Sequence, residues 1–475
     1  MPSVPLEGSP GPAAVPEAPG VFSSPVQARM GESKKELTSR PFFATARLGE
    51  FTDTKRLRPH LAASFLSPRR DARPGAKDTR RTSESASSLF AASASSGEAE
   101  PPPGAVSCGA AGCRIIGVGS ATPSHEMTNS DMAEVVETTD EWIRTRTGIR
   151  SRRVLSTSES LRPLAISAAR RALQNAKVKA RDVDLVLHAS SSPDDLFGDA
   201  TSIAAGIVHA ERIEEGTAGQ EGDAIVGPAG FDLTAACSGF LVGLISANAF
   251  LTSPCCPYKR ILVVGADALT RWIDWTDRNT CVLFGDGAGA VVLERQDATT
   301  QPPAGEGELE RDTRKGILSY MLNSDGLQAH QLTVPFKGIP QELKRAEGKP
   351  ALCMSQGGYA SLAMNGREVF KFVSRKVPPA IEAVVQAAGL RTSDIDWLLL
   401  HQANKRIMDA VAERLKMPLS KVLCNLDKYG NTSAASIPLC LDEAVREGKV
   451  KPGDVVVTAG FGAGLTWSAA VFRYG

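Results

Sequence analysis

The sequence has little net charge, few aromatic residues and no long apolar run. Its 54 Lys and Arg residues nearly balance 53 Asp and Glu residues, and Phe, Trp and Tyr make up 5% of the chain. A nearly neutral chain has no field strong enough to gather nucleic acid. No uninterrupted apolar run approaches the ~20 residues that a membrane-spanning helix needs. We therefore expect neither nucleic-acid binding nor a membrane span.

The cysteines lack the spacing of a structural framework. Nine are spread over 475 residues without a Cys-x-x-Cys pair, and only Cys255 and Cys256 are adjacent. Disulfide-rich secreted domains and zinc ribbons have denser and more regular patterns, and no His has metal-ligand spacing with another His or Cys. We expect a reducing compartment, no bound metal, and thiols that are either structural or reactive.

The first 112 residues lack the apolar periodicity of a packed core. Six prolines lie within residues 2–19, and between Lys34 and Arg81 there are 13 Lys and Arg residues against five acidic residues. Seven serines follow within residues 83–96. A basic, Ser-rich and unpatterned composition is typical of an organelle transit region, and a disordered linker or regulatory tail is the alternative. We expect residues 1–112 to be an extension outside the folded body.

The body of the chain, from residue 113 onward, has an α/β pattern that occurs twice. Three pairs of segments match in the same order, and the first pair aligns without gaps. Single α/β units can look alike anywhere, but three matches in one order favour duplication. We expect two similar halves, 113–315 and 316–475, packed as one unit. The matched segments are 180–187 with 392–399, 260–265 with 454–458, and 284–293 with 461–472.

The body contains two long glycine-rich stretches and two short glycine clusters. The stretches 211–230 and 295–315 are rich in Gly, Pro, Glu and Thr and are interpreted as surface insertions, which loops tolerate at little cost. The clusters 285–289 and 462–464 are followed by strand-like runs, whereas a dinucleotide fingerprint needs a helix there. We interpret both clusters as tight turns that present backbone N–H groups.

Cys237 lies where a short apolar strand runs into a helical pattern. It precedes Ser238 and Gly239 and is surrounded by small residues that leave room for a substrate. The unpaired N–H groups and positive dipole end of a helix stabilise a thiolate, which is the nucleophilic form of cysteine. Cys237 is therefore a candidate nucleophile, with a buried structural thiol as the alternative.

Four further residues carry side chains suited to binding or catalysis. His401 follows the apolar strand 395–400, and α/β folds place active sites at such strand ends; a hydrogen-bonded core histidine is the alternative. Asn431 lies in a Gly-Asn-Thr-Ser segment that by itself indicates a turn or a helix N-cap. Trp142 and Arg146 share one face of a helix that a capping-box pattern over 138–141 opens, and a solvent-exposed cation–π pair is the bland interpretation.

Six segments of the body form a specific set by their sequence, order and spacing. They are 139–149, 235–240, 284–289, 401–407, 430–433 and 461–467. Together they resemble the β-ketoacyl-acyl carrier protein synthase III family, the condensing enzymes that initiate type II fatty-acid synthesis. The resemblance covers essentially all of residues 113–475. It implies an α/β fold of the thiolase type, with two duplicated halves in five α-β-α-β-α layers.

The resemblance also implies roles for individual residues. Cys237, His401 and Asn431 match the catalytic set, in which the thiol carries an acyl group taken from acyl-CoA and the other two hold the enolate of malonyl-acyl carrier protein. The oxyanion of the acyl transfer is then bound by backbone N–H groups of Cys237 and Ala463; many relatives have Gly at the latter position. The family's other binding residues correspond to Trp142, Arg146, Arg278 and Gly366 for CoA, Phe197 and Phe461 for the acyl pocket and a homodimer contact, and Lys371, Lys405, Arg406 and Arg414 for the carrier protein.

These residues predict an acyltransferase that needs no cofactor beyond its substrates. The expected product is acetoacetyl-carrier protein, made in a plastid or relict plastid, with the mitochondrion as the alternative compartment. A polyketide starter enzyme with another acceptor is a related alternative. A non-catalytic scaffold that binds acyl carrier protein is an alternative of a different class.

Overall fold

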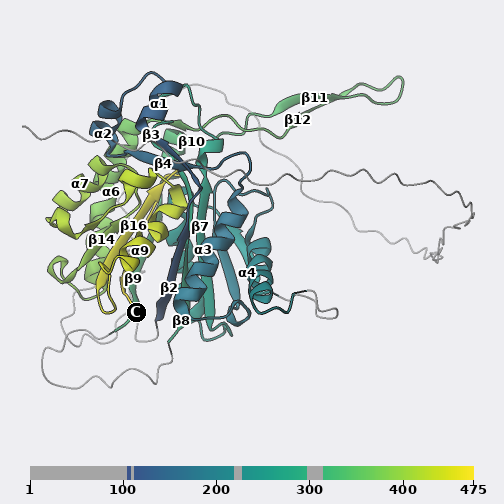
Figure 1. Cartoon of the computed structure of the whole chain (residues 1–475). Helices are drawn as coiled ribbons and strands as arrows, with labels where there is room; N and C mark the ends of the chain where they lie inside the picture. Colours follow the sequence, from purple (N-terminus) through teal and green to yellow (C-terminus); the bar gives the residue numbers. More distant parts are fainter. Residues whose placement is uncertain (1–103, 109–111, 219–226, 297–313) are drawn as a thin grey trace, which may run out of the picture. The chain divides into compact units, whose positions relative to one another are not determined.

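Figure 1 shows the computed structural model of the chain, which describes residues 104–108, 112–218, 227–296 and 314–475. The predicted extension 1–112 therefore lies almost entirely outside the described residues. The described part contains two mixed β-sheets, each with helices on both faces. No helix of this part is both long and apolar enough to cross a membrane.

The first sheet has five strands in the order β2-β8-β7-β5-β6. β5 runs parallel to both of its neighbours, whereas β7, β8 and β2 are joined by antiparallel pairs. Strands covered on both faces are apolar on both faces, which explains the unbroken apolar runs in this half. The strands are β2 (Cys113–Ala121), β5 (Leu185–Ala189), β6 (Ala229–Leu233), β7 (Arg260–Ala268) and β8 (Asp286–Arg295).

The second sheet repeats this topology in the order β1-β9-β17-β16-β14-β15. β14 runs parallel to β15 and β16, while β16, β17 and β9 are joined by antiparallel pairs. Apart from the edge strand β1, both sheets thus have the same strand order and directions, so the predicted duplication is confirmed. The strands are β1 (Val106–Ser107), β9 (Gly316–Ser324), β14 (Trp397–Leu400), β15 (Val422–Leu423), β16 (Val455–Gly462) and β17 (Thr466–Arg473).

The long helices complete the five predicted layers. One pair packs on the outer face of the first sheet, a second pair lies between the two sheets, and a third pair covers the second sheet from outside. The five-layered α-β-α-β-α arrangement is therefore confirmed. The pairs are α3 (Leu161–Ala176) with α4 (Ala200–Glu214), α5 (Gly239–Thr252) with α9 (Ser436–Arg446), and α6 (Gly366–Ala387) with α7 (Lys405–Arg414).

Short elements surround one end of the sheets. Among them, the two-stranded hairpin of β11 and β12 projects from the body in Figure 1, and all of its strand residues are exposed. The short elements are β3 (His125–Thr128), α1 (Asn129–Val135), α2 (Asp140–Thr147), β4 (Ser151–Val154), β10 (Leu332–Thr333), β11 (Ile339–Leu343), β12 (Leu352–Gln356), β13 (Ala363–Met364) and α8 (Leu426–Tyr429).

The structure moves several predicted boundaries. Ordered pairing begins before residue 113, because β1 pairs with β9 and the N–H of Cys108 donates to the carbonyl of Leu318 at 2.8 Å. This strand, which precedes the first half, adds to the edge of the second half's sheet. The insertion predicted at 211–230 overlaps both α4 and β6, whereas the one at 295–315 fits the connection between β8 and β9.

Two local predictions were wrong. The glycine cluster at 285–289 is not a turn, because β8 begins at Asp286; a Cβ on Gly289 would lie 2.7 Å from the backbone N of Leu439 in α9, so glycine lets helix and strand approach. The helix that carries Trp142 is capped one residue later than expected. Its N-cap is Thr139, whose hydroxyl accepts from the N–H of Trp142 at 3.1 Å.

Candidate active site

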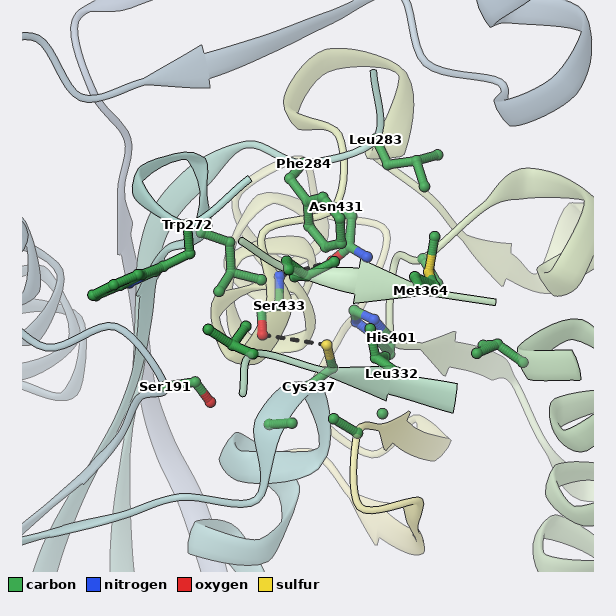
Figure 2. Close-up of a pocket in the computed structure, with 18 of the residues that line it drawn as sticks. Ser191, Cys237, Trp272, Leu283, Phe284, Leu332, Met364, His401, Asn431 and Ser433 are labelled. Atoms are coloured by element: carbon green, nitrogen blue, oxygen red, sulfur yellow. Dashed lines mark hydrogen bonds between the residues drawn. The ribbon is translucent and has the colours of Figure 1, made fainter. Parts of the chain in front are cut away.

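A cavity of about 760 Å³ is lined by residues of both halves. Cys237 reaches it from the first half, and His401 and Asn431 reach it from the second half. Figure 2 shows these three side chains converging on one space. Residues that are far apart in the sequence meet here because the paired sheets bring their strand ends together.

Cys237 lies in a 3₁₀ turn between β6 and α5, as the sequence predicted. Its side chain is 6% exposed, and the preceding Ala236 has a φ of 48°, a conformation that lets the chain turn sharply into the helix. The hydroxyl of Ser433 donates a hydrogen bond to the sulfur at 3.3 Å, which is drawn in Figure 2. The thiol is thus enclosed but faces the cavity.

The resting thiol is harder to ionise than the helix end alone would suggest. Burial raises the pKa of Cys237 to about 12; the hydrogen bond from Ser433 lowers the pKa, and the carboxylate of Asp267 raises it. The expectation of a thiolate stabilised by the helix is therefore corrected for the free protein, because desolvation disfavours the charged form more strongly.

His401 directly follows β14 and is 1% exposed. Its Nδ1 lies 2.7 Å from the hydroxyl of Ser436, and that hydroxyl also accepts from the N–H of Gln402 at 3.3 Å. Burial lowers the pKa of His401 to about 3, so the ring is neutral at physiological pH. When the Ser436 hydroxyl donates to Nδ1, the ring proton is on Nε2, which is then a hydrogen-bond donor.

Asn431 lies between α8 and the 3₁₀ turn 433–435. Its Oδ1 accepts from the N–H of Ser433 at 2.9 Å, which leaves the amide NH₂ as the group available to a ligand. Its backbone is fixed by two bonds to the first half, from Asn431 N to Leu283 O at 2.8 Å and from Gly285 N to Asn431 O at 3.0 Å. The turn predicted from the sequence is therefore also part of the cavity wall.

Ala463 lies in the turn between β16 and β17 and lines the cavity. The non-glycine residues with positive φ in the described part of the chain are Lys177, Ala236, Lys416 and Ser433, so Ala463 is not strained by its methyl group. The preceding Gly462 packs against the thiol residue, because a Cβ there would lie 2.9 Å from the backbone N of Cys237. The backbone groups predicted to bind an oxyanion are thus close together.

The predicted CoA-binding residues gather at the cavity. Trp142 on α2 has the guanidinium of Arg146 at 5.0 Å and that of Arg278 at 5.1 Å from its ring centroid. Trp142, Arg146 and Gly366, the first residue of α6, line the cavity. A flat ring beside two cations suits a planar, phosphorylated ligand.

The two phenylalanines of the predicted acyl pocket behave differently. Phe461 at the end of β16 is 2% exposed and packs edge-on against the ring of His401, with centroids 5.2 Å apart. Phe197 is 98% exposed in the loop before α4 and does not line this cavity, although Leu196 does. Phe197 therefore has no role in the pocket of its own chain.

The four basic residues predicted to bind a carrier protein do not form one group. Lys371 pairs with Glu368 at 2.6 Å, and Lys405 pairs with Asp409 at 2.7 Å. Lys405 and Arg406 begin α7 beside the cavity-lining Asn404, whereas Arg414 ends that helix, about 14 Å further along its axis. Arg414 lines a separate hollow with Lys416 and Lys421.

Sequence reasoning missed several polar residues that position the site. Ser433 and Ser436 contact Cys237 and His401, and no sequence signal distinguishes them from other serines near a turn. Arg152 is fully buried, and its guanidinium donates to the carbonyl of Val282 at 2.7 Å. An arginine inside the short strand β4 was the available signal, because such side chains are rarely buried without partners.

Chemically, the cavity combines a nucleophile with hydrogen-bond donors in a dry setting. The sulfur of Cys237 can attack a carbonyl carbon, while neutral donors from His401 and Asn431 can stabilise an oxygen that becomes negative during reaction. Such fixed donors need little reorganisation when the charge forms.

Comparisons with known proteins identify the family to which these features belong. The model described as 3-oxoacyl-[acyl-carrier-protein (ACP)] synthase III matches residues 231–326, and the model of its C-terminal part matches residues 385–474. The chain is 50% identical over 361 residues to the β-ketoacyl-[acyl-carrier-protein] synthase III of Microcystis aeruginosa, covering 76% of this chain and 97% of that protein.

A plant protein and a solved structure give the same result. The chloroplastic β-ketoacyl-[acyl-carrier-protein] synthase III of Arabidopsis thaliana is 47% identical, with 76% of this chain and 83% of that protein covered. The crystal structure of 3-oxoacyl-[acyl-carrier-protein] synthase III from Aquifex aeolicus superposes with a TM-score of 0.62 at 35% identity and covers 76% of this chain and 100% of that one. The chain therefore belongs to the β-ketoacyl-[acyl-carrier-protein] synthase III family.

Proposed function

We propose that the chain condenses an acyl-CoA primer, best represented by acetyl-CoA, with malonyl-acyl carrier protein and so starts type II fatty-acid synthesis. The observation that carries this proposal is the meeting of Cys237, His401 and Asn431 in one cavity of a chain from this family. No cofactor takes part in the proposed reaction.

In the first step the sulfur of Cys237 attacks the thioester carbon of acyl-CoA. A carbon–sulfur bond forms to Cys237, the bond to the CoA sulfur breaks, and the thiol proton of Cys237 is transferred to the departing CoA. The N–H groups of Cys237 and Ala463 hold the oxyanion of the tetrahedral intermediate in this proposal. Gly462 supports it by leaving space beside the N–H of Cys237.

In the second step malonyl-acyl carrier protein loses CO₂ and becomes an enolate. Nε2–H of His401 and the side-chain NH₂ of Asn431 donate to the enolate oxygen. The enolate carbon then attacks the acyl group and expels Cys237 as a thiolate, which takes up a proton from solvent. Loss of one such donor typically lowers turnover by ~10²–10³.

The rim of the cavity supports the binding of both substrates. Trp142 with Arg146 and Arg278 suits the adenine and phosphates of CoA, and Gly366 lines the path toward Cys237. Lys371, Lys405 and Arg406 suit an acidic carrier protein, because the exposed ion pairs of Lys371 and Lys405 are weak and can exchange partners. Arg414 lies too far along α7 to join this group.

A homodimer accounts for the exposed apolar residues beside the cavity. Phe197 and Leu196 are 98% and 82% exposed in one loop, and the edge strand β6 leaves Phe231 45% exposed. A second copy that covers this edge would bury them and bring Phe197 toward the partner's acyl pocket. Sedimentation that gives a monomer at micromolar concentration would contradict this part of the proposal.

We assign the protein to a plastid or relict plastid, with the mitochondrion as the alternative. The chloroplastic location of the Arabidopsis relative and the basic, Ser-rich composition of residues 1–112 support this assignment. Fusing residues 1–112 to a fluorescent reporter tests it, and a cytosolic signal would contradict it.

The central experiment measures an acyl adduct and then its condensation. Mass spectrometry after exposure to acetyl-CoA should show an added acetyl group on Cys237, and Cys237→Ala should abolish both the adduct and the condensed product. A wild-type protein that forms no adduct would favour the carrier-binding scaffold instead. Comparing malonyl-CoA with malonyl-acyl carrier protein as extender separates the fatty-acid enzyme from a polyketide starter enzyme.

A further inference from the structure

Ser433 contacts two of the three catalytic side chains at once. Its hydroxyl donates to the sulfur of Cys237 at 3.3 Å, and its backbone N–H donates to Oδ1 of Asn431 at 2.9 Å. Figure 2 shows the hydroxyl pointing at the sulfur, with their hydrogen bond drawn as a dashed line. Ser433 is 1% exposed, so both contacts are shielded from water.

The surrounding structure fixes Ser433 in this position. It begins a 3₁₀ turn with a φ of 52°, a conformation that few non-glycine residues adopt without support. The next residue holds the turn, because the N–H of Ala434 donates to Oδ2 of Asp267 at 3.1 Å. The hydroxyl is therefore directed at the sulfur by the backbone rather than by a freely rotating loop.

Besides the hydroxyl of Ser433, the backbone N–H of Cys237 itself lowers the pKa of the thiol, whereas the neighbouring side chains give no such help. The buried carboxylate of Asp267 raises the pKa of Cys237, and burial raises it further. His401 is neutral because burial lowers its pKa to about 3. Within the described residues, the hydroxyl of Ser433 is the side-chain donor recorded on the sulfur.

We propose that Ser433 is a further catalytic residue, whose hydroxyl stabilises the sulfur of Cys237 as it becomes negatively charged. The hydroxyl donates a hydrogen bond and keeps its proton throughout. It acts when the thiol attacks acyl-CoA, with the thiol proton transferred to the CoA sulfur, and again when condensation expels the sulfur. This inference rests on the proposed function, since it assigns a role within the same reaction.

Ser433→Ala isolates the hydroxyl, because alanine keeps the N–H that orients Asn431. The rate of acylation of the full chain by acetyl-CoA, followed by mass spectrometry of samples quenched at successive times, should fall by about tenfold to a hundredfold. This is the usual effect of losing a hydrogen bond to a charged group. The pH at which acylation reaches half of its maximum should also rise. Ser238→Ala is the matched control, since Ser238 is buried beside Cys237 but its hydroxyl bonds to the carbonyl of Thr466 at 3.3 Å.

A second measurement separates catalysis from a structural effect. In a Cys237→Ala background the sulfur is absent, so adding Ser433→Ala should leave the decarboxylation of malonyl-acyl carrier protein unchanged. The inference would be overturned if Ser433→Ala slowed decarboxylation in the Cys237→Ala background as much as it slows acylation in the otherwise wild-type protein. It would also be overturned if the single variant Ser433→Ala kept the wild-type acylation rate and pH profile. Absence of any adduct on the wild-type protein would instead count against the proposed function.

Discussion

The buried neutral ring of His401 makes a quantitative prediction about stability at acidic pH. In the unfolded chain a histidine has a pKa near 6.5, and in the folded protein burial lowers the pKa of His401 to about 3. Between these values the unfolded state binds a proton that the folded state does not. The contribution of His401 to the free energy of unfolding is therefore fully present above pH ~6.5 and is lost as the pH falls toward ~3.

The size of the effect follows from the pKa difference. At pH 5 the unfolded ring is almost fully protonated, about 1.5 pH units below its pKa, while the folded ring is neutral. Each unit corresponds to about 1.4 kcal/mol, so His401 should lower the free energy of unfolding by about 2 kcal/mol between pH 8 and pH 5. The ring is 1% exposed, so solvent screening does not reduce this value much.

Urea unfolding of the wild type and of His401→Gln at both pH values measures this contribution. Other titrating groups contribute to both proteins and cancel in the difference, so the wild type should lose about 2 kcal/mol more than the variant on going to pH 5. An equal loss in both proteins would mean that His401 is protonated in the folded state. The assignment of its Nε2–H as a neutral donor would then fail as well.

Three further predictions concern residues in and around the site, and each is tested by substitution. Arg152→Met should lower the free energy of unfolding, measured by urea unfolding, by roughly 3–5 kcal/mol, because the buried oxygens that accept from Arg152 lose their donor. The control Arg153→Met removes a more exposed ion pair and should change the free energy of unfolding by less than about 1 kcal/mol. Equal losses in the two variants would contradict the role given to Arg152. Trp142→Ala should raise the KM for acetyl-CoA by roughly tenfold or more with little change in kcat, and an unchanged KM would exclude stacking on this ring. Gly462→Ala places a methyl group 2.9 Å from the N of Cys237, so single-turnover acylation should fall by ~10²-fold or more while the fold persists; a wild-type rate would remove that N–H from the oxyanion site.

Local patterns were sufficient to predict the elements and the strand ends that carry the site. The apolar run before His401 and the small residues around Cys237 indicate their backbone positions without knowledge of the partners. The repeated segments predicted two similar halves because a shared topology preserves the order of buried strands. The CoA-binding roles of Trp142 and Arg278 came only from the family resemblance, since the local pattern puts Trp142 beside Arg146 on a helix without indicating a ligand, and a loop arginine carries no local signal.

Properties that depend on contacts across the chain could not be predicted in this way. Ser433 lies 196 residues from Cys237 in the sequence, so nothing local shows that its hydroxyl meets the sulfur. The raised pKa of Cys237 results mainly from burial, which is a property of the packed halves and not of the helix end beside it. The helix cap at Thr139 differed by one residue because neighbouring threonines offer the same hydroxyl.

The duplication relates two 3₁₀ turns, Ala236–Ser238 in the first half and Ser433–Ala435 in the second half, that differ in their roles. The first residue of each 3₁₀ turn has positive φ, 48° at Ala236 and 52° at Ser433. In the second half, the N–H of Ala434 is occupied, because Asp267 at the end of β7 accepts from it at 3.1 Å.

Strand register shows that Gly462 occupies the position that Asp267 has in the other half. Ile261 pairs with Leu185 and Val456 pairs with Trp397 at equivalent places in the two sheets. Asp267 lies six residues after Ile261, and Gly462 lies six residues after Val456. Glycine offers no acceptor there and leaves the N–H of Cys237 open to the cavity. An aspartate at 462 would occupy that N–H and place a second carboxylate beside the sulfur. The asymmetry between these two equivalent positions therefore leaves an open N–H in the turn that carries the nucleophile and an occupied N–H in the turn that carries Ser433.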